Sequence, residues 1–184
     1  MKTRVNSNPF TPLLQQKNYL PWLLYGLATL LVLLLQTAPN FFPTVFHARP
    51  IPLVAFVICV AVLGGARTGT SVGVLAGVLW GVFSFRLFAL DALVLMLFGL
   101  AAGLLVEWYL RANFYTAMLL CAGGIFLYVL LEWFFCYVIF QKENLSEILL
   151  TVLLPNGMYT LVLAPFVYML CYSIARFIRR RANA

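Results

Sequence analysis

Apolar residues along the chain are grouped into long runs, separated by short polar or proline-containing stretches. A run of about 20 apolar residues is long enough to cross a hydrocarbon layer roughly 30 Å thick. The pattern therefore predicts six membrane-spanning helices. They lie near residues 20–36, 51–65, 68–85, 89–108, 115–140 and 158–177. The second run is short and the fifth is long, so we expect tilted helices or a shared boundary.

Composition agrees with a membrane protein. Of 184 residues, 64% are hydrophobic and 9% are charged, which leaves too few polar side chains to cover a water-soluble surface. A cleaved signal peptide is the alternative for the first run, because basic residues precede it. That run is long for a signal peptide and 37–39 is a poor cleavage site. We therefore predict an all-α integral membrane bundle of six transmembrane helices over residues 19–178, with no separate soluble domain.

Basic residues fall mainly on one side of this predicted bundle. Loops rich in lysine and arginine stay in the cytoplasm, and an inside N-terminus puts nine basic residues there and three outside. The nine are Lys2, Arg4, Lys17, Arg67, Arg111, Arg176, Arg179, Arg180 and Arg181, against Arg49, Arg86 and Lys142. Residues 1–18 and 179–184 are thus expected to be cytoplasmic tails. The terminal arginines would meet anionic headgroups of the lipid bilayer, so the net charge of +7 requires no nucleic acid.

The last third of the chain contains an internal break. Residues 148–177 are mostly apolar but too long for one span, and Pro155-Asn156-Gly157 interrupts them. Proline removes a helical hydrogen bond, while asparagine and glycine tolerate turns. We predict a short interfacial helix near 144–154, which starts at a capping box, and then the sixth span.

Glycines recur every four residues in the third predicted span. Small residues let helices in a bilayer approach closely, and such contact drives their association. We therefore expect a groove, used either for packing within the chain or for a partner or ligand. Its predicted residues are Gly69, Gly73, Gly77 and Gly81 in this span, and the next span repeats the pattern with Gly99 and Gly103.

Few residues are suited to chemistry. Glu132 lies inside the fifth span, where a carboxylate costs on the order of 3 kcal/mol unless it is paired, hydrated or protonated. Asp91 and Glu107 lie at the ends of the fourth span and are predicted to be interfacial. His47 is the single histidine, and the four cysteines are scattered along the sequence with no close pair. We predict no enzyme, no catalytic residue, no metal and no cofactor.

Several short motifs, in order, resemble the bacterial rod shape-determining family MreD. The similarity covers the chain from about residue 49 to its end. The matching positions are Arg49 and Pro50, then Gly73 and Gly77, then a partial match over 88–93, and then Leu154, Pro155, Tyr159, Ala164 and Pro165 before a basic tail. Three positions depart from the family pattern: Ile51, Gly81 and Thr160.

The resemblance implies a non-catalytic scaffold of the cell-elongation machinery in the bacterial plasma membrane. Such a subunit would pack with the single-span protein MreC and would link MreB filaments to the peptidoglycan polymerase RodA and its transpeptidase. It also implies the fold of energy-coupling-factor substrate-binding subunits. A vitamin-binding subunit of that transporter class is therefore the alternative, and its site would use Glu132, Trp133, Asn156 and Tyr159.

Overall fold

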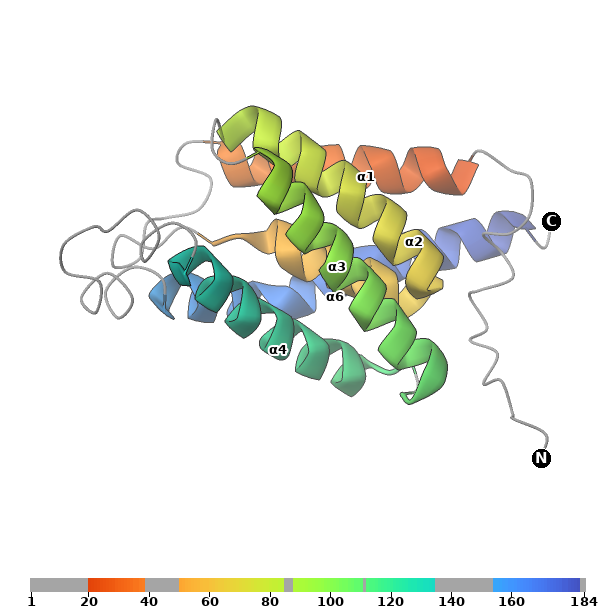
Figure 1. Cartoon of the computed structure of the whole chain (residues 1–184). Coiled ribbons are helices and arrows are strands. Elements are labelled where there is room, and N and C mark those ends of the chain that lie inside the picture. The colour runs from red at the N-terminus through yellow and green to blue at the C-terminus, as the bar shows by residue number, and fades with distance from the viewer. Residues whose placement is uncertain (1–19, 39–49, 85–87, 111, 135–153, 183–184) are drawn as a thin grey trace.

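The computed structural model describes residues 20–38, 50–84, 88–110, 112–134 and 154–182, and this part of the chain is all-helical. The described residues form five helices, which pack together as a bundle (Figure 1). They are α1 (Leu20–Thr37), α2 (Pro52–Ser84), α3 (Phe88–Trp108), α4 (Phe114–Trp133) and α6 (Leu154–Ala182). Four of them, α2, α3, α4 and α6, are long and apolar enough to cross a membrane, while the apolar part of α1 is shorter. The architecture is that of a helical membrane bundle.

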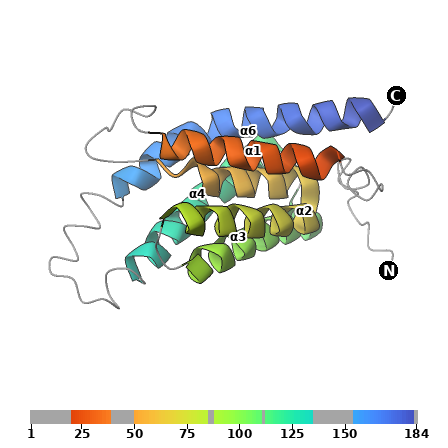
Figure 2. The same ribbon diagram turned by 90° about the horizontal axis from the view of Figure 1, so that it is seen from above.

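Helix α2 is bent sharply at Gly65. This residue has φ 82° and ψ 178°, a conformation that is essentially restricted to glycine. The bend divides α2 into a first limb, residues 52–64, and a second limb, residues 66–84. The two limbs run back alongside each other (Figures 1 and 2), and Gly69 in the second limb closely approaches Ala61 in the first. They correspond to the second and third apolar runs of the sequence.

The first limb is the centre of the core. Its residues from Leu53 to Leu63 are at most 2% exposed, and α2 packs against α1, α3, α4 and α6. A helix that is apolar on every side has to be shielded from water by other helices or by lipid, and here the other helices enclose the first limb. The limb is about 20 Å long at 1.5 Å per residue, less than the hydrocarbon thickness.

Helix α6 differs from the predicted sixth span. It begins at Leu154 rather than near 158 and continues to Ala182. Pro155 lies in its first turn, where a missing N–H group has no intrahelical partner in any case. Of the predicted interfacial helix near 144–154, residues 144–153 lie outside the described part of the chain. The same holds for residues 1–18, Arg49, residues 135–140 of the fifth predicted span, and residues 183–184.

The two ends of the bundle differ in charge. The start of α1, the Gly65 bend and the end of α6 lie at one end (Figures 1 and 2). We call it the basic end, because it holds all the arginines of the described part: Arg67, Arg176, Arg179, Arg180 and Arg181. The opposite end holds the C-terminus of α4 with Glu132 and the N-terminus of α6, and we call it the polar end.

Candidate functional site

The predicted glycine groove lies on the second limb of α2, and α3 fills it. A Cβ atom on Gly73 would lie 2.5 Å from the carbonyl oxygen of Leu95, and one on Gly69 would lie 2.7 Å from that of Gly99. Real Cβ atoms do not come this close to backbone. The two helices therefore touch backbone to backbone, which only glycine permits at these positions.

The same contact extends along the whole pair. A Cβ atom on Gly77 would collide with the backbone of Ala92, and one on Gly103 with the backbone of Ala66. Gly81 is also buried. At Gly69, Gly73 and Gly77 the groove is thus occupied by the chain's own α3, which leaves no space there for a ligand or a partner helix.

Glu107, near the C-terminus of α3, forms a hydrogen bond to the bend in α2. Its Oε1 atom accepts a hydrogen bond of 2.9 Å from the backbone N–H of Ala66, the first residue after Gly65. The N–H groups at the start of a helix lack acceptors within that helix. Glu107 therefore caps the second limb at the basic end. The sequence did not predict this role, because Glu107 and Ala66 are 41 positions apart.

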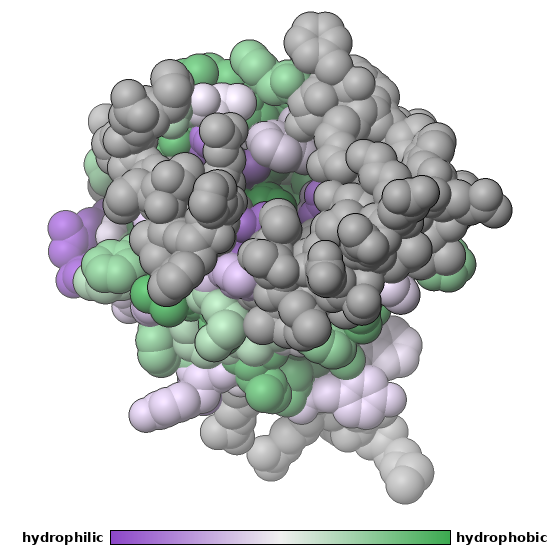
Figure 3. All heavy atoms as spheres, turned by 90° about the vertical axis from the view of Figure 1, so that its left-hand side faces the viewer, coloured by the Kyte–Doolittle hydropathy of each residue, from purple (hydrophilic) through white to green (hydrophobic). Residues whose placement is uncertain are grey.

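A small pocket with both polar and apolar walls opens at the polar end, between the first limb of α2, α4 and α6. Figure 3 views this end and shows hydrophilic side chains gathered in a central hollow. The pocket is lined by Ile51, Val54, Ile125, Tyr128, Val129, Glu132, Asn156, Gly157 and Thr160. Its volume is about 10 Å³, enough for about one water molecule.

Hydrogen bonds beside this pocket join two motif segments. The backbone N–H of Ile51 donates to Thr160 Oγ1 at 2.9 Å, and Thr160 in turn donates to the carbonyl oxygen of Asn156 at 2.7 Å. Gly157 allows the close approach of α6 to α4, since a Cβ atom there would lie 3.2 Å from Val129. The segment after Pro50 and the first turns of α6 thus form one unit.

Gln36, at the end of α1, adds a polar group that sequence analysis missed. Its Oε1 atom accepts a hydrogen bond of 3.2 Å from the N–H of Leu53, while its Nε2 atom is buried without a partner in the described part of the chain. In the sequence, Gln36 stands out only as a single amide at the end of an apolar run. Its side chain lies at the same end of the bundle as the pocket.

The remaining motif positions lie just before α2 and along α6. Pro50, just before α2, is buried, Ala164 is fully buried, and Tyr159 is half-buried. Pro165 lines an open apolar groove between α4 and α6 with a volume of about 730 Å³. The other lining residues are Phe114, Tyr115, Thr116, Met118, Leu119, Ala122, Leu161 and Val162.

Comparisons with known proteins give no family assignment. No protein-family model matches the chain, no curated protein is detectably similar, and no solved structure matches the fold. The similarity to MreD therefore depends on the short motifs alone.

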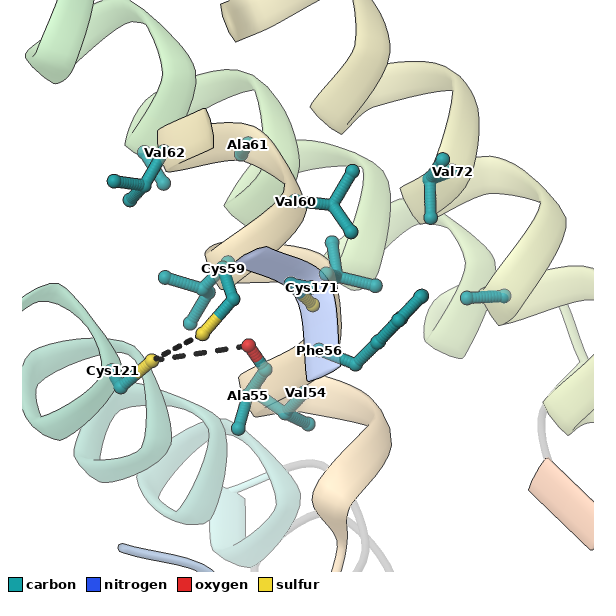
Figure 4. Packing of buried hydrophobic residues seen from close by; sticks show 14 of the residues in the cluster. Val54, Ala55, Phe56, Cys59, Val60, Ala61, Val62, Val72, Cys121 and Cys171 are labelled. Atoms are coloured by element: carbon teal, nitrogen blue, oxygen red, sulfur yellow. Dashed lines mark hydrogen bonds between the residues drawn. The ribbon is translucent and has the colours of Figure 1, made fainter. Parts of the chain in front are cut away.

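Three cysteines that are distant in the sequence meet in the core. Cys59 on α2 and Cys121 on α4 have their sulfur atoms 3.7 Å apart, and Cys171 on α6 lies beside them (Figure 4). The sequence predicted no close pair, because the three residues are on different helices. The described residues contain no group of three or more histidine, cysteine or acidic side chains arranged to hold a metal ion.

Proposed function

We propose that the protein is a non-catalytic scaffold subunit of the bacterial cell-elongation machinery, similar to MreD. In this proposal the chain crosses the plasma membrane six times, with the two limbs of α2 counted as two crossings. The basic end faces the cytoplasm, as the distribution of arginines favours. The C-terminus and the start of α1 then lie on the same side.

The hydrogen bond from Ile51 to Thr160 is the observation that carries this proposal. The two residues are 109 positions apart, and each lies inside one of the segments through which the chain resembles MreD. Their contact supports a shared structural unit, even though the side chains at these two positions differ from the family pattern.

The surfaces that remain open are suited to binding helices rather than to chemistry. Because the glycine groove is filled by α3, a partner has to use another surface. The groove between α4 and α6 is apolar and runs along two spans, so it could accept the single membrane-spanning helix of an MreC-like partner. Contacts with RodA and its transpeptidase, and indirectly with MreB, would follow from that assembly.

Co-purification with an MreC-like protein tests the proposal. We expect the two proteins to be recovered together after co-expression and detergent extraction. Ala122→Trp, which places a large ring in the groove, should reduce recovery of the partner at least several-fold. Ala101→Trp, on the exposed side of α3, is the matched control and should not. Failure of the wild-type pair to co-purify would contradict the scaffold role.

A vitamin-transporter subunit is distinguished by its ligand. Binding sites for such molecules have volumes of several hundred Å³, whereas the described walls at the polar end enclose about 10 Å³. A vitamin that binds the folded protein must raise its melting temperature. We expect no shift above about 1 °C with any water-soluble vitamin at 100 µM, and a shift of several degrees would favour the transporter.

A further inference from the structure

Three thiols from three helices converge at the middle of the bundle. Cys59, Cys121 and Cys171 are each 0% exposed. Figure 4 shows the sulfur of Cys121 directed toward the sulfur of Cys59 and toward the carbonyl oxygen of Ala55, at 3.7 and 3.8 Å. These contacts are long and weak, so neither thiol is held by a strong acceptor.

We propose that Cys59 and Cys121 are a disulfide-forming pair, which links the first limb of α2 to α4 when an uncharged peroxide enters the membrane. The sulfur atoms, now in van der Waals contact, have to approach to about 2.05 Å. Both residues lie on helices that already pack together, so the two sulfur atoms have to close by less than about 2 Å. Cys171 also interacts with Cys59, so it competes with Cys121 for the link, and the variants below distinguish the two pairings.

The chemistry balances with hydrogen peroxide as the oxidant. One thiol is oxidised to a sulfenic acid, and the peroxide is reduced to water. The second sulfur then attacks the sulfenic sulfur, the S–O bond breaks, and the hydroxide leaves as a second water with the attacking thiol's proton. Both thiols lose one electron each in total, and one S–S bond forms.

An apolar interior favours this product over a metal complex. A disulfide is neutral, whereas two thiolates around a monovalent soft metal would leave a net charge in a medium that cannot solvate it. Both thiols are fully buried, so the oxidant reaches them rarely and the first step is slow. The pair should therefore respond to sustained exposure to peroxide rather than to a brief pulse.

The link would act on the walls of the pocket at the polar end. Val54 and Ile125 line that pocket, and each lies about one helical turn from its cysteine. The disulfide would close a covalent loop between Cys59 and Cys121, which are 62 positions apart. It would also fix the distance between the helices that carry Val54 and Ile125. The oxidised protein is expected to be more resistant to heat, because the cross-link restricts the unfolded chain.

The test uses the full chain in detergent with Cys136, which lies outside the described residues, replaced by alanine. After hours in millimolar peroxide, remaining thiols are blocked in denaturant and peptides are mapped by mass spectrometry. We expect a peptide joining Cys59 to Cys121, an intact mass lower by about 2 Da, and a rise in melting temperature of at least about 5 °C that a reductant reverses.

Two variants assign the pair. Cys171→Ala should keep the cross-link, and Cys121→Ala should abolish it. A link between Cys59 and Cys171, or oxidation to sulfinic acid with no linked peptide, would overturn the proposal. If a second substitution prevents folding, the peptide mapping in the Cys136→Ala protein alone still shows which cysteines are linked. A copper or silver adduct without the Cys59–Cys121 link would also contradict the proposal.

Discussion

The pair formed by α2 and α3 and the pair formed by α4 and α6 show two ways to join membrane helices. In the first pair, glycines on both helices bring backbone against backbone. In the second, aromatic rings set the spacing: Phe114 and Tyr168 meet edge to face at 5.3 Å, and an open groove remains beside them. The first interface is closed to any partner, while the second is still available.

Glycine content alone does not distinguish these two interfaces. Helix α4 also contains adjacent glycines. A Cβ atom on Gly123 would meet no atom of another described helix within 4 Å, and one on Gly124 would approach only the side chain of Ile58. Contact with backbone therefore determines whether a glycine is required. Substitutions that add a side chain should follow this order in their effect on stability.

The largest effect is expected for Gly99→Leu. Its Cβ atom would collide with the carbonyl oxygen of Gly69, so α3 would have to move away along its length. Overpacking typically costs about 1–3 kcal/mol and more when backbone has to shift. We expect a melting temperature at least 10 °C lower, or no folded protein, as followed by intrinsic tryptophan fluorescence.

Gly123→Leu is the matched control for this prediction. It places the same side chain on an exposed glycine of α4, where there is open space. Its melting temperature should stay within about 2 °C of the wild type. Equal losses for the two variants would show that the α2–α3 contact is not special.

The next largest effect is expected for Gly65→Ala. A φ of 82° with an extended ψ is costly for any residue with a Cβ atom, by roughly 1–3 kcal/mol. The melting temperature should fall by about 3–10 °C. Gly26→Ala, in a helical position with nothing within 4 Å, is the control, and a similar fall there would argue against strain at the bend.

A smaller effect is expected for Glu107→Ala, because it removes the acceptor for the N–H of Ala66. Loss of a capping group costs about 1 kcal/mol. Glu107→Gln keeps an oxygen at this position and should recover at least half of the loss. Thermal unfolding of both variants at one pH gives the comparison, and identical values would mean that the hydrogen bond contributes nothing.

The smallest effect is expected for Gly124→Ala. The added Cβ atom would clash with the Cδ1 atom of Ile58 and otherwise make only an ordinary contact with its Cγ1 atom. Because Cδ1 is the far end of a flexible side chain, the cost should stay below about 1 kcal/mol. Ile58→Val removes that atom. A double-mutant cycle should show that the cost of Gly124→Ala vanishes in the Ile58→Val background, and a cost that persists would place the clash elsewhere.

Much of the helical pattern could be predicted from the sequence, because apolar run length is a local property. Helix α3 begins one residue before its predicted span and ends with it, and α1 matches within one residue at its C-terminus. The sequence also placed a boundary at Gly65, where α2 bends. Regular glycine spacing predicted close helix contact at Gly69, Gly73 and Gly77, but it could not say which helix would fill the groove.

Contacts between distant segments could not be predicted in this way. Glu107 caps a helix 41 positions earlier, and Cys59 meets Cys121 across 62 positions. Each contact depends on how the helices cross and rotate, which is set by packing of the whole bundle. A single sequence shows which side of a helix carries small residues, but it does not show which other helix packs against that side.

The enclosure of the first limb of α2 has a consequence for the order in which its contacts can form. Its residues from Leu53 to Leu63 are at most 2% exposed, and α2 packs against α3, α4 and α6 as well as α1. Three of these four neighbours follow α2 in the sequence. The limb can therefore be fully covered only after the C-terminal half of the chain has packed against it.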